Sequence, residues 1–152
     1  MKKNIVTLFC CVVVAFFLVG CEVGDAIKSD IQKIIIGGKY NANDYMYVNS
    51  GDVHVYYDNK VPAPVAHRLA TGFQRELEIY HTIDIIVTKT HDNRYYRLVF
   101  FSNETNAGFI QRLAWESMAD DVARIMQDNV VLVFETKRGQ HIYTAGPTDF
   151  IF

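Results

Sequence analysis

The chain has 152 residues, of which 50% are hydrophobic and 13% aromatic, so it is long and apolar enough to form one domain with a packed core. This composition excludes a chain that is disordered throughout. The formal net charge of −2 provides no excess of basic residues that would attract nucleic acid or an anionic bilayer.

The chain begins with two basic residues and a long apolar run. Lys2 and Lys3 precede residues 5–19, a stretch without a charged side chain that no cluster of basic residues follows. As a helix this run would span about 22 Å, which is less than the hydrocarbon core of a bilayer. We therefore expect a cleaved secretory signal over residues 1–20.

The apolar run ends in Leu18, Val19, Gly20 and Cys21. These residues match the lipobox at all four positions, so the first 21 residues resemble a bacterial lipoprotein precursor. The resemblance implies that the signal is cut between Gly20 and Cys21, that the Cys21 thiol receives a diacylglyceryl group, and that the new amine is acylated in many bacteria. A thiolate is a strong nucleophile for forming this thioether. The shortness of the run disfavours the alternative, a signal anchor with an incidental cysteine.

Acylation of Cys21 would keep the mature protein on a membrane, because two buried acyl chains already give stable attachment. Cleavage removes Cys10 and Cys11, so no pair of free cysteines remains for a disulfide. It also lowers Lys plus Arg from 15 to 13 against 17 Asp plus Glu, a net charge of −4. In lipoproteins of enteric bacteria, aspartate after the lipidated cysteine marks retention in the inner membrane. Glu22 here implies, for a Gram-negative source, the outer membrane with the domain facing the periplasm.

Residues 21–50 are expected to form a lipidated tether with one short amphipathic helix. Asp25 can cap this helix, Gly37 can end it, and one face carries Ile27, Ile31, Ile34 and Ile35. Packing of the helix on the domain is favoured over a position on the bilayer surface, because its polar face carries few charges. The Asn-rich stretch 41–52 is typical of a linker or a loosely paired edge strand.

Residues 51–152 are predicted to form a globular α+β domain. We expect, in chain order, a strand at 53–57, a helix from Pro62, a hairpin of 82–90 and 94–101, a helix from Asn103 or Asn106 to about Asp128, and a hairpin of 130–136 and 140–145. The second helix carries an apolar stripe of Ile110, Ala114, Met118, Val122 and Ile125.

This order, β-α-β-β-α-β-β, favours a two-layer α+β sandwich in which two helices cover one face of a mainly antiparallel sheet. We expect a ferredoxin-like or related arrangement. A unit of one helix and one hairpin would be used twice, at 62–101 and 107–145.

The strand at 94–101 is rich in aromatic residues on both of its faces, although a sheet covered on one side should alternate. The sheet face away from the helices is therefore a candidate binding face for a protein or a flat ligand, formed by Tyr56, Tyr57, Tyr95, Arg97 and Tyr143. Packing of these tyrosines under the tether helix and the linker is an equally open alternative.

The histidines stand at no recognised metal-ligand spacing and are interpreted as solvated polar residues: His54, His67, His81, His91 and His141. His81 with Asp84 is the nearest case, but residues three apart on a strand point to opposite faces. The sequence thus indicates no metal site and no cofactor.

The mature chain also lacks the motifs of nucleophilic catalysis and of phosphate-binding loops, so we expect no catalytic residues. Asp121 is the one acid that stands out, because it is expected to be half-buried on the second helix. A structural bond to a tyrosine, an arginine or a backbone amide is favoured over a role as a general acid or base.

These observations favour a non-enzymatic envelope lipoprotein whose domain binds a protein partner, in envelope assembly or as an immunity protein against a toxin. A binder of small ligands or glycans that uses tyrosines for stacking is the alternative. A hydrolase is the least favoured class. Membrane lipid, through Cys21, is the other expected partner.

Overall fold

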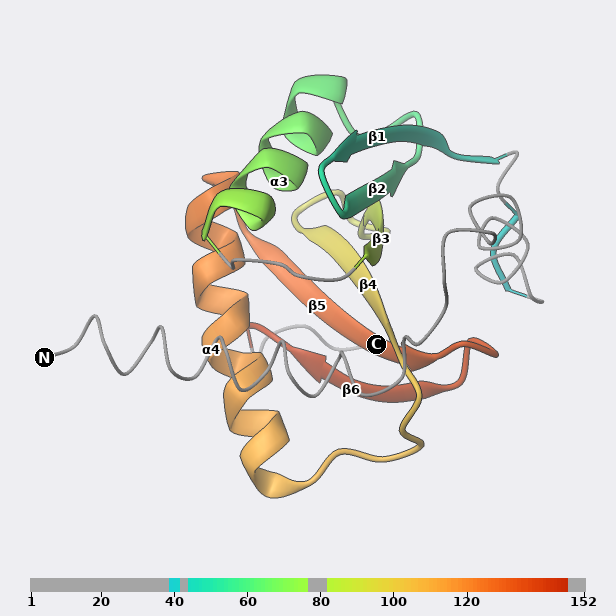
Figure 1. Ribbon diagram of the computed structural model, residues 1–152, viewed down its shortest axis with the longest axis vertical. Helices are drawn as coiled ribbons and strands as arrows, with labels where there is room; N and C mark the ends of the chain where they lie inside the picture. Colours follow the sequence, from blue (N-terminus) through green and yellow to red (C-terminus); the bar gives the residue numbers. More distant parts are fainter. Residues whose placement is uncertain (1–38, 42–43, 77–81, 148–152) are drawn as a thin grey trace, which may run out of the picture.

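The computed structural model describes residues 39–41, 44–76 and 82–147. The predicted signal, the lipobox with Cys21, the amphipathic helix and His81 lie outside these residues. The described part contains, in chain order, β1 (Met46–Ser50), β2 (Val53–Tyr57), α3 (Ala63–Glu76), β3 (Ile83–Lys89), β4 (Tyr96–Ser102), α4 (Phe109–Met126), β5 (Val130–Thr136) and β6 (His141–Ala145) (Figure 1).

The six strands form one mixed sheet in which the spatial order is the sequence order, β1-β2-β3-β4-β5-β6. The three hairpin pairs β1–β2, β3–β4 and β5–β6 are antiparallel, whereas β2–β3 and β4–β5 are parallel. The parallel pairs are those that a helix connects, because the helix returns the chain to the end of the sheet from which the first strand started. The predicted α+β class, with a mainly antiparallel sheet, is confirmed.

Two details of the topology differ from the ferredoxin-like arrangement. Strands joined by a helix are direct neighbours here, whereas a third strand separates them in the split ferredoxin-like motif. In addition, β1 lies within the stretch 41–52 and pairs with β2 along its whole length. This stretch therefore contains an edge strand of the sheet, and the sheet begins before residue 51.

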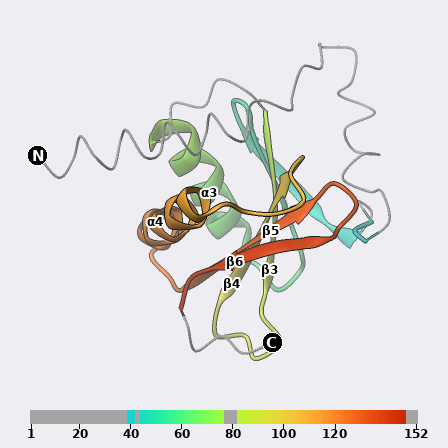
Figure 2. The ribbon, with the colours of Figure 1, turned by 90° about the horizontal axis from the view of Figure 1, so that it is seen from below.

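Both helices lie on the same face of the sheet, and both crossovers step in the direction of β6 (Figure 2). The strands of the first crossover, β2 and β3, run opposite to β4 and β5 of the second. The hand of a crossover depends on the face of the sheet that carries the helix, on the direction in which the chain moves across the sheet, and on the direction of the strands. Between the two crossovers only the direction of the strands changes. The two crossovers therefore have opposite hands, and one of them departs from the right-handed rule.

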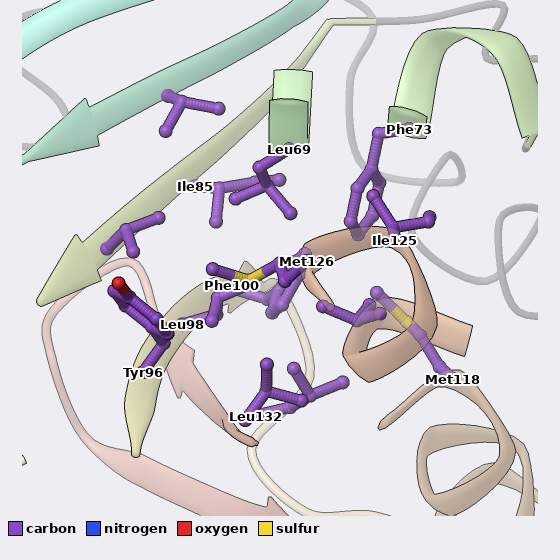
Figure 3. Close-up of a cluster of buried hydrophobic side chains, with 14 of the residues drawn as sticks. Leu69, Phe73, Ile85, Tyr96, Leu98, Phe100, Met118, Ile125, Met126 and Leu132 are labelled. Atoms are coloured by element: carbon purple, nitrogen blue, oxygen red, sulfur yellow. The ribbon is translucent and has the colours of Figure 1, made fainter. Parts of the chain in front are cut away.

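The core lies between the two helices and the inner face of the sheet (Figure 3). Leu69 and Phe73 of α3 are fully buried one turn apart, and the indole of Trp115 on α4 stacks on Phe134 of β5 at 3.9 Å between ring centroids. Gly72 lets the helices approach closely, because a Cβ there would lie 2.3 Å from Cγ2 of Ile125. Neither helix of the described part is both long and apolar enough to span a membrane.

The outer face of the sheet, away from the helices, carries a second and smaller apolar cluster formed by Tyr40, Tyr56, Ile86, Tyr95, Val99, Val131 and Val133. Tyr45 and Phe101 pack against it. Tyr40 and Tyr45 precede β1, and we call residues 39–41 and 44–45 the strap. The strap therefore packs on the side of the sheet opposite to α3 and α4.

Candidate functional site

The five residues of the predicted binding face do not form one surface. Tyr56, Tyr95 and Arg97 lie on the outer face, whereas Tyr57 and Tyr143 belong to the helix side. Neighbours such as Tyr56 and Tyr57 must point to opposite faces of a strand. Tyr56, Tyr57 and Tyr95 are also buried, so the prediction of a single aromatic binding face is wrong.

The strap shares the apolar cluster of the outer face with Tyr56 and Tyr95. The ring of Tyr40 contacts Phe101 edge-on at 6.0 Å and Tyr45 at 6.4 Å between centroids. The alternative expectation is that the tyrosines of the sheet pack under the tether helix and the linker, and the strap agrees with it in part, since the tether helix lies outside the described residues. The described structure places Tyr40 and Tyr45 of the strap in the packing.

Hydrogen bonds to Glu135 of β5 hold the strap on the sheet. Glu135 is only 1% exposed and accepts hydrogen bonds from Lys39 Nζ at 2.7 Å, Tyr40 Oη at 2.9 Å and Arg97 Nη2 at 3.1 Å. Burial raises the pKa of the Tyr40 phenol. A buried carboxylate with two cations and a hydroxyl around it is a satisfied structural group. We therefore infer that this cluster serves to hold the strap on the outer face of the sheet.

His54 does not fit the expectation of a solvated histidine. Its side chain is 18% exposed, and Nδ1 lies 3.2 Å from Oδ1 of Asp84, which is also 18% exposed. The parallel register of β2 and β3 places these two residues opposite each other. His67, His91 and His141 are exposed, as expected.

Asp121 forms an ion pair with Arg124, three residues further along α4, and its side chain is largely buried. This is one of the structural bonds that the sequence interpretation favoured over general acid-base chemistry. Within the described part of the chain, no group of three or more His, Cys, Asp or Glu side chains is arranged to hold a metal ion.

An exposed apolar cluster, which we call the α4 patch, lies at the start of α4. Its three residues are Phe109, Ile110 and Leu113, with exposed fractions of 76%, 64% and 48%. Their spacing of one and four residues places them on adjoining parts of one helix face. They form the largest group of exposed, bulky apolar side chains in the described residues.

The exposure of Ile110 corrects the predicted apolar stripe of the second helix. Ala114, Met118, Val122 and Ile125 are buried as predicted, but a series with a spacing of four residues drifts by about 40° at each step. Ile110 therefore lies about 80° from Met118, at the boundary of the buried face. The first turns of α4 thus carry apolar residues on the exposed face as well as on the buried face. This pattern is the sequence signal that could have identified the patch.

The positively charged side chain of Arg112 is held beside the α4 patch. Arg112 donates from Nε to the carbonyl oxygen of Ala107 at 3.1 Å, and its guanidinium lies 5.5 Å from the ring centroid of Tyr143. Tyr143 in turn donates to Glu116 at 2.7 Å, and this bond, followed by burial, raises the pKa of the phenol. Arg112 is exposed and forms no ion pair within the described residues.

Comparison with known proteins finds no matching family model, no similar curated protein and no similar solved structure. The function is therefore inferred from the geometry and chemistry of the chain itself.

Proposed function

We propose that this chain is a lipid-anchored lipoprotein of the bacterial envelope whose domain binds another protein through the α4 patch. The exposure of Phe109, Ile110 and Leu113 carries this proposal. The core of the described residues is complete without these side chains, so nothing in this part of the chain requires them to be apolar. Adjoining exposed apolar side chains mark interaction surfaces, because a partner that covers them removes apolar area from water.

The chemistry around the patch favours a protein segment that is apolar and carries a carboxylate. Arg112 is held beside the patch by Ala107 and Tyr143 and has no acidic partner among the described residues. A partner carboxylate would form a charge-assisted hydrogen bond with it at little entropic cost, because the guanidinium is already oriented. An anionic bilayer is less favoured, since the mature chain would have a net charge of −4.

The proposed anchor is Cys21, on the sequence resemblance alone. Two or three acyl chains would confine the domain to a membrane surface and raise its effective concentration near partners on that surface. Intact-mass measurement of the protein extracted from native membranes tests this part. We expect a chain that begins at Cys21 with the added mass of its acyl groups, and an intact Met1 or an unmodified Cys21 would contradict the anchor.

Affinity capture from solubilised membranes, with quantitative mass spectrometry, tests the binding surface. Leu113→Asp places a charge in the centre of the patch and should reduce capture of the specific partner by more than about 10-fold. Met46→Asp on β1 is the matched control, because Met46 is 46% exposed and belongs to another surface. Equal capture by both variants would contradict the proposed surface. An envelope protein as the partner would favour assembly, and a toxin would favour immunity.

A further inference from the structure

A second cluster of polar and aromatic groups lies on the outer face, away from the α4 patch. Its members are Tyr47 on β1, His54 and Tyr56 on β2, and Asp84 on β3. Tyr47 is the register partner of Tyr56, and His54 is the register partner of Asp84. Because His54 and Tyr56 are two residues apart on one strand, all four side chains share one face of three neighbouring strands.

We propose that this cluster binds an organic cation, namely the ammonium or guanidinium group of a ligand. The proposal does not depend on the anchor or on the α4 patch. It makes specific the alternative function in which the chain binds a small ligand.

The first argument is the charge of Asp84. Oδ1 accepts a hydrogen bond from Nδ1 of His54, and a neutral imidazole leaves the charge of the carboxylate uncompensated. Within the described residues Asp84 forms no ion pair with a lysine or an arginine. Glu135 on the same face is compensated by both Lys39 and Arg97. On this face, Asp84 therefore differs from Glu135 in having no lysine or arginine partner among the described residues.

The second argument is that two further polar atoms of the cluster, Nε2 of His54 and Oδ2 of Asp84, are acceptors in contact with solvent. Because Nδ1 of His54 donates to Asp84, Nε2 of a neutral ring carries a lone pair. Every buried side-chain nitrogen and oxygen of the described residues has a hydrogen-bond partner. Since no bond is found for Nε2 of His54 or Oδ2 of Asp84, both atoms reach solvent. Acceptors of this kind suit a ligand with several N–H donors.

The third argument is the position of the aromatic rings. Tyr47 is 46% exposed, and its ring lies 5.6 Å from the His54 ring and 5.2 Å from the Tyr56 ring between centroids. Burial, and after it the negative charge of Asp84, raises the pKa of both phenols, as expected if the carboxylate is close to them. A ring face beside a carboxylate attracts a cation by both its quadrupole and the ion pair.

Calorimetric titration of the full-length protein in detergent micelles tests the proposal with two probes. Agmatine presents a guanidinium and an ammonium group on a free small molecule, and a capped peptide with a single arginine presents a guanidinium group on a side chain. Saturable binding of either probe supports the proposal, and the probe that binds more tightly identifies the source of the cation. Absence of saturable binding of both probes at millimolar concentrations would overturn it.

Variants then distinguish binding of the probe at this cluster from general attraction of a cation to an acidic protein. Asp84→Asn keeps the size of the side chain and should weaken binding by at least about 10-fold, and Tyr47→Leu should weaken it several-fold. Asp120→Asn is the matched control, because it removes the same charge from an exposed position on α4 and should leave binding unchanged. An equal loss in Asp84→Asn and Asp120→Asn would overturn the proposal. Circular dichroism of each variant verifies that the fold is retained.

Discussion

The two faces of the sheet are stabilised in different ways. The inner face is a continuous apolar surface that α3 and α4 cover with aromatic and aliphatic side chains. The outer face combines a smaller apolar cluster with buried or half-buried acids, and the strap covers part of it. The inner face therefore depends on shape and volume, whereas the outer face depends on how charges are paired.

The largest effect is expected from loss of volume on the inner face. Phe134 is fully buried and stacks on both Trp115 and Phe100, so Phe134→Ala should lower the free energy of unfolding by about 4 kcal/mol. Phe101 on the outer face is only partly buried, and Phe101→Ala should cost clearly less. Urea unfolding measures both values, and equal losses would contradict the difference between the faces.

Charge pairing is expected to dominate on the outer face. Arg97→Met removes one of the two cations beside the buried Glu135 and should cost about 3 kcal/mol, although the substitution preserves most of the apolar stem. The double variant Arg97→Met, Glu135→Met should recover most of this loss, because no buried charge is then left without its partner. If the double variant is less stable than Arg97→Met, the packing of the strap, and not the charge of Glu135, sets the stability of this face.

The close contact of the two helices gives a smaller prediction for the inner face. Gly72→Ala would place a Cβ against Ile125 and should lower the free energy of unfolding by about 2 kcal/mol, despite the better helix propensity of alanine. Gly108→Ala is the control, since a Cβ at that position meets no atom within 4 Å. Thermal unfolding of the two variants should rank Gly72→Ala as the less stable, and the reverse order would contradict a tight helix crossing.

The smallest effect concerns the alkaline titration of the outer face. The pKa of Tyr56 is higher in the folded protein than the value of 10.0 for a free phenol, so its contribution to stability is present below pH 10 and is lost as the pH rises further. Asp84→Asn removes one cause of this shift and should lower the pKa of Tyr47 and Tyr56, while burial keeps both above 10.0. The ultraviolet absorbance of phenolate measures the titration of the two tyrosines. Titration curves that are the same with and without Asp84→Asn would contradict an effect of the Asp84 charge on these phenols.

Local periodicity was sufficient to predict the two helices, five of the six strands and the α+β class. The parallel pairs, the place of β1 in the sheet and the opposite hands of the crossovers depend on contacts between distant segments, which no local pattern encodes. For the same reason, local pattern did not predict the pairing of His54 with Asp84, 30 residues apart, or of Arg97 with Glu135, 38 residues apart. Ile110 lies off the buried face of α4 because a series with a spacing of four residues drifts around the helix.

Site-specific photocrosslinking in living cells tests most directly the claim that the α4 patch is a protein-binding surface. A photoreactive residue at Leu113 should produce a discrete adduct with one protein, and Arg112→Glu should abolish that adduct by repelling the partner carboxylate. The same residue at Met46 should produce no such adduct. Adducts at Leu113 with lipid alone, or the same adducts at both positions, would contradict the proposed function.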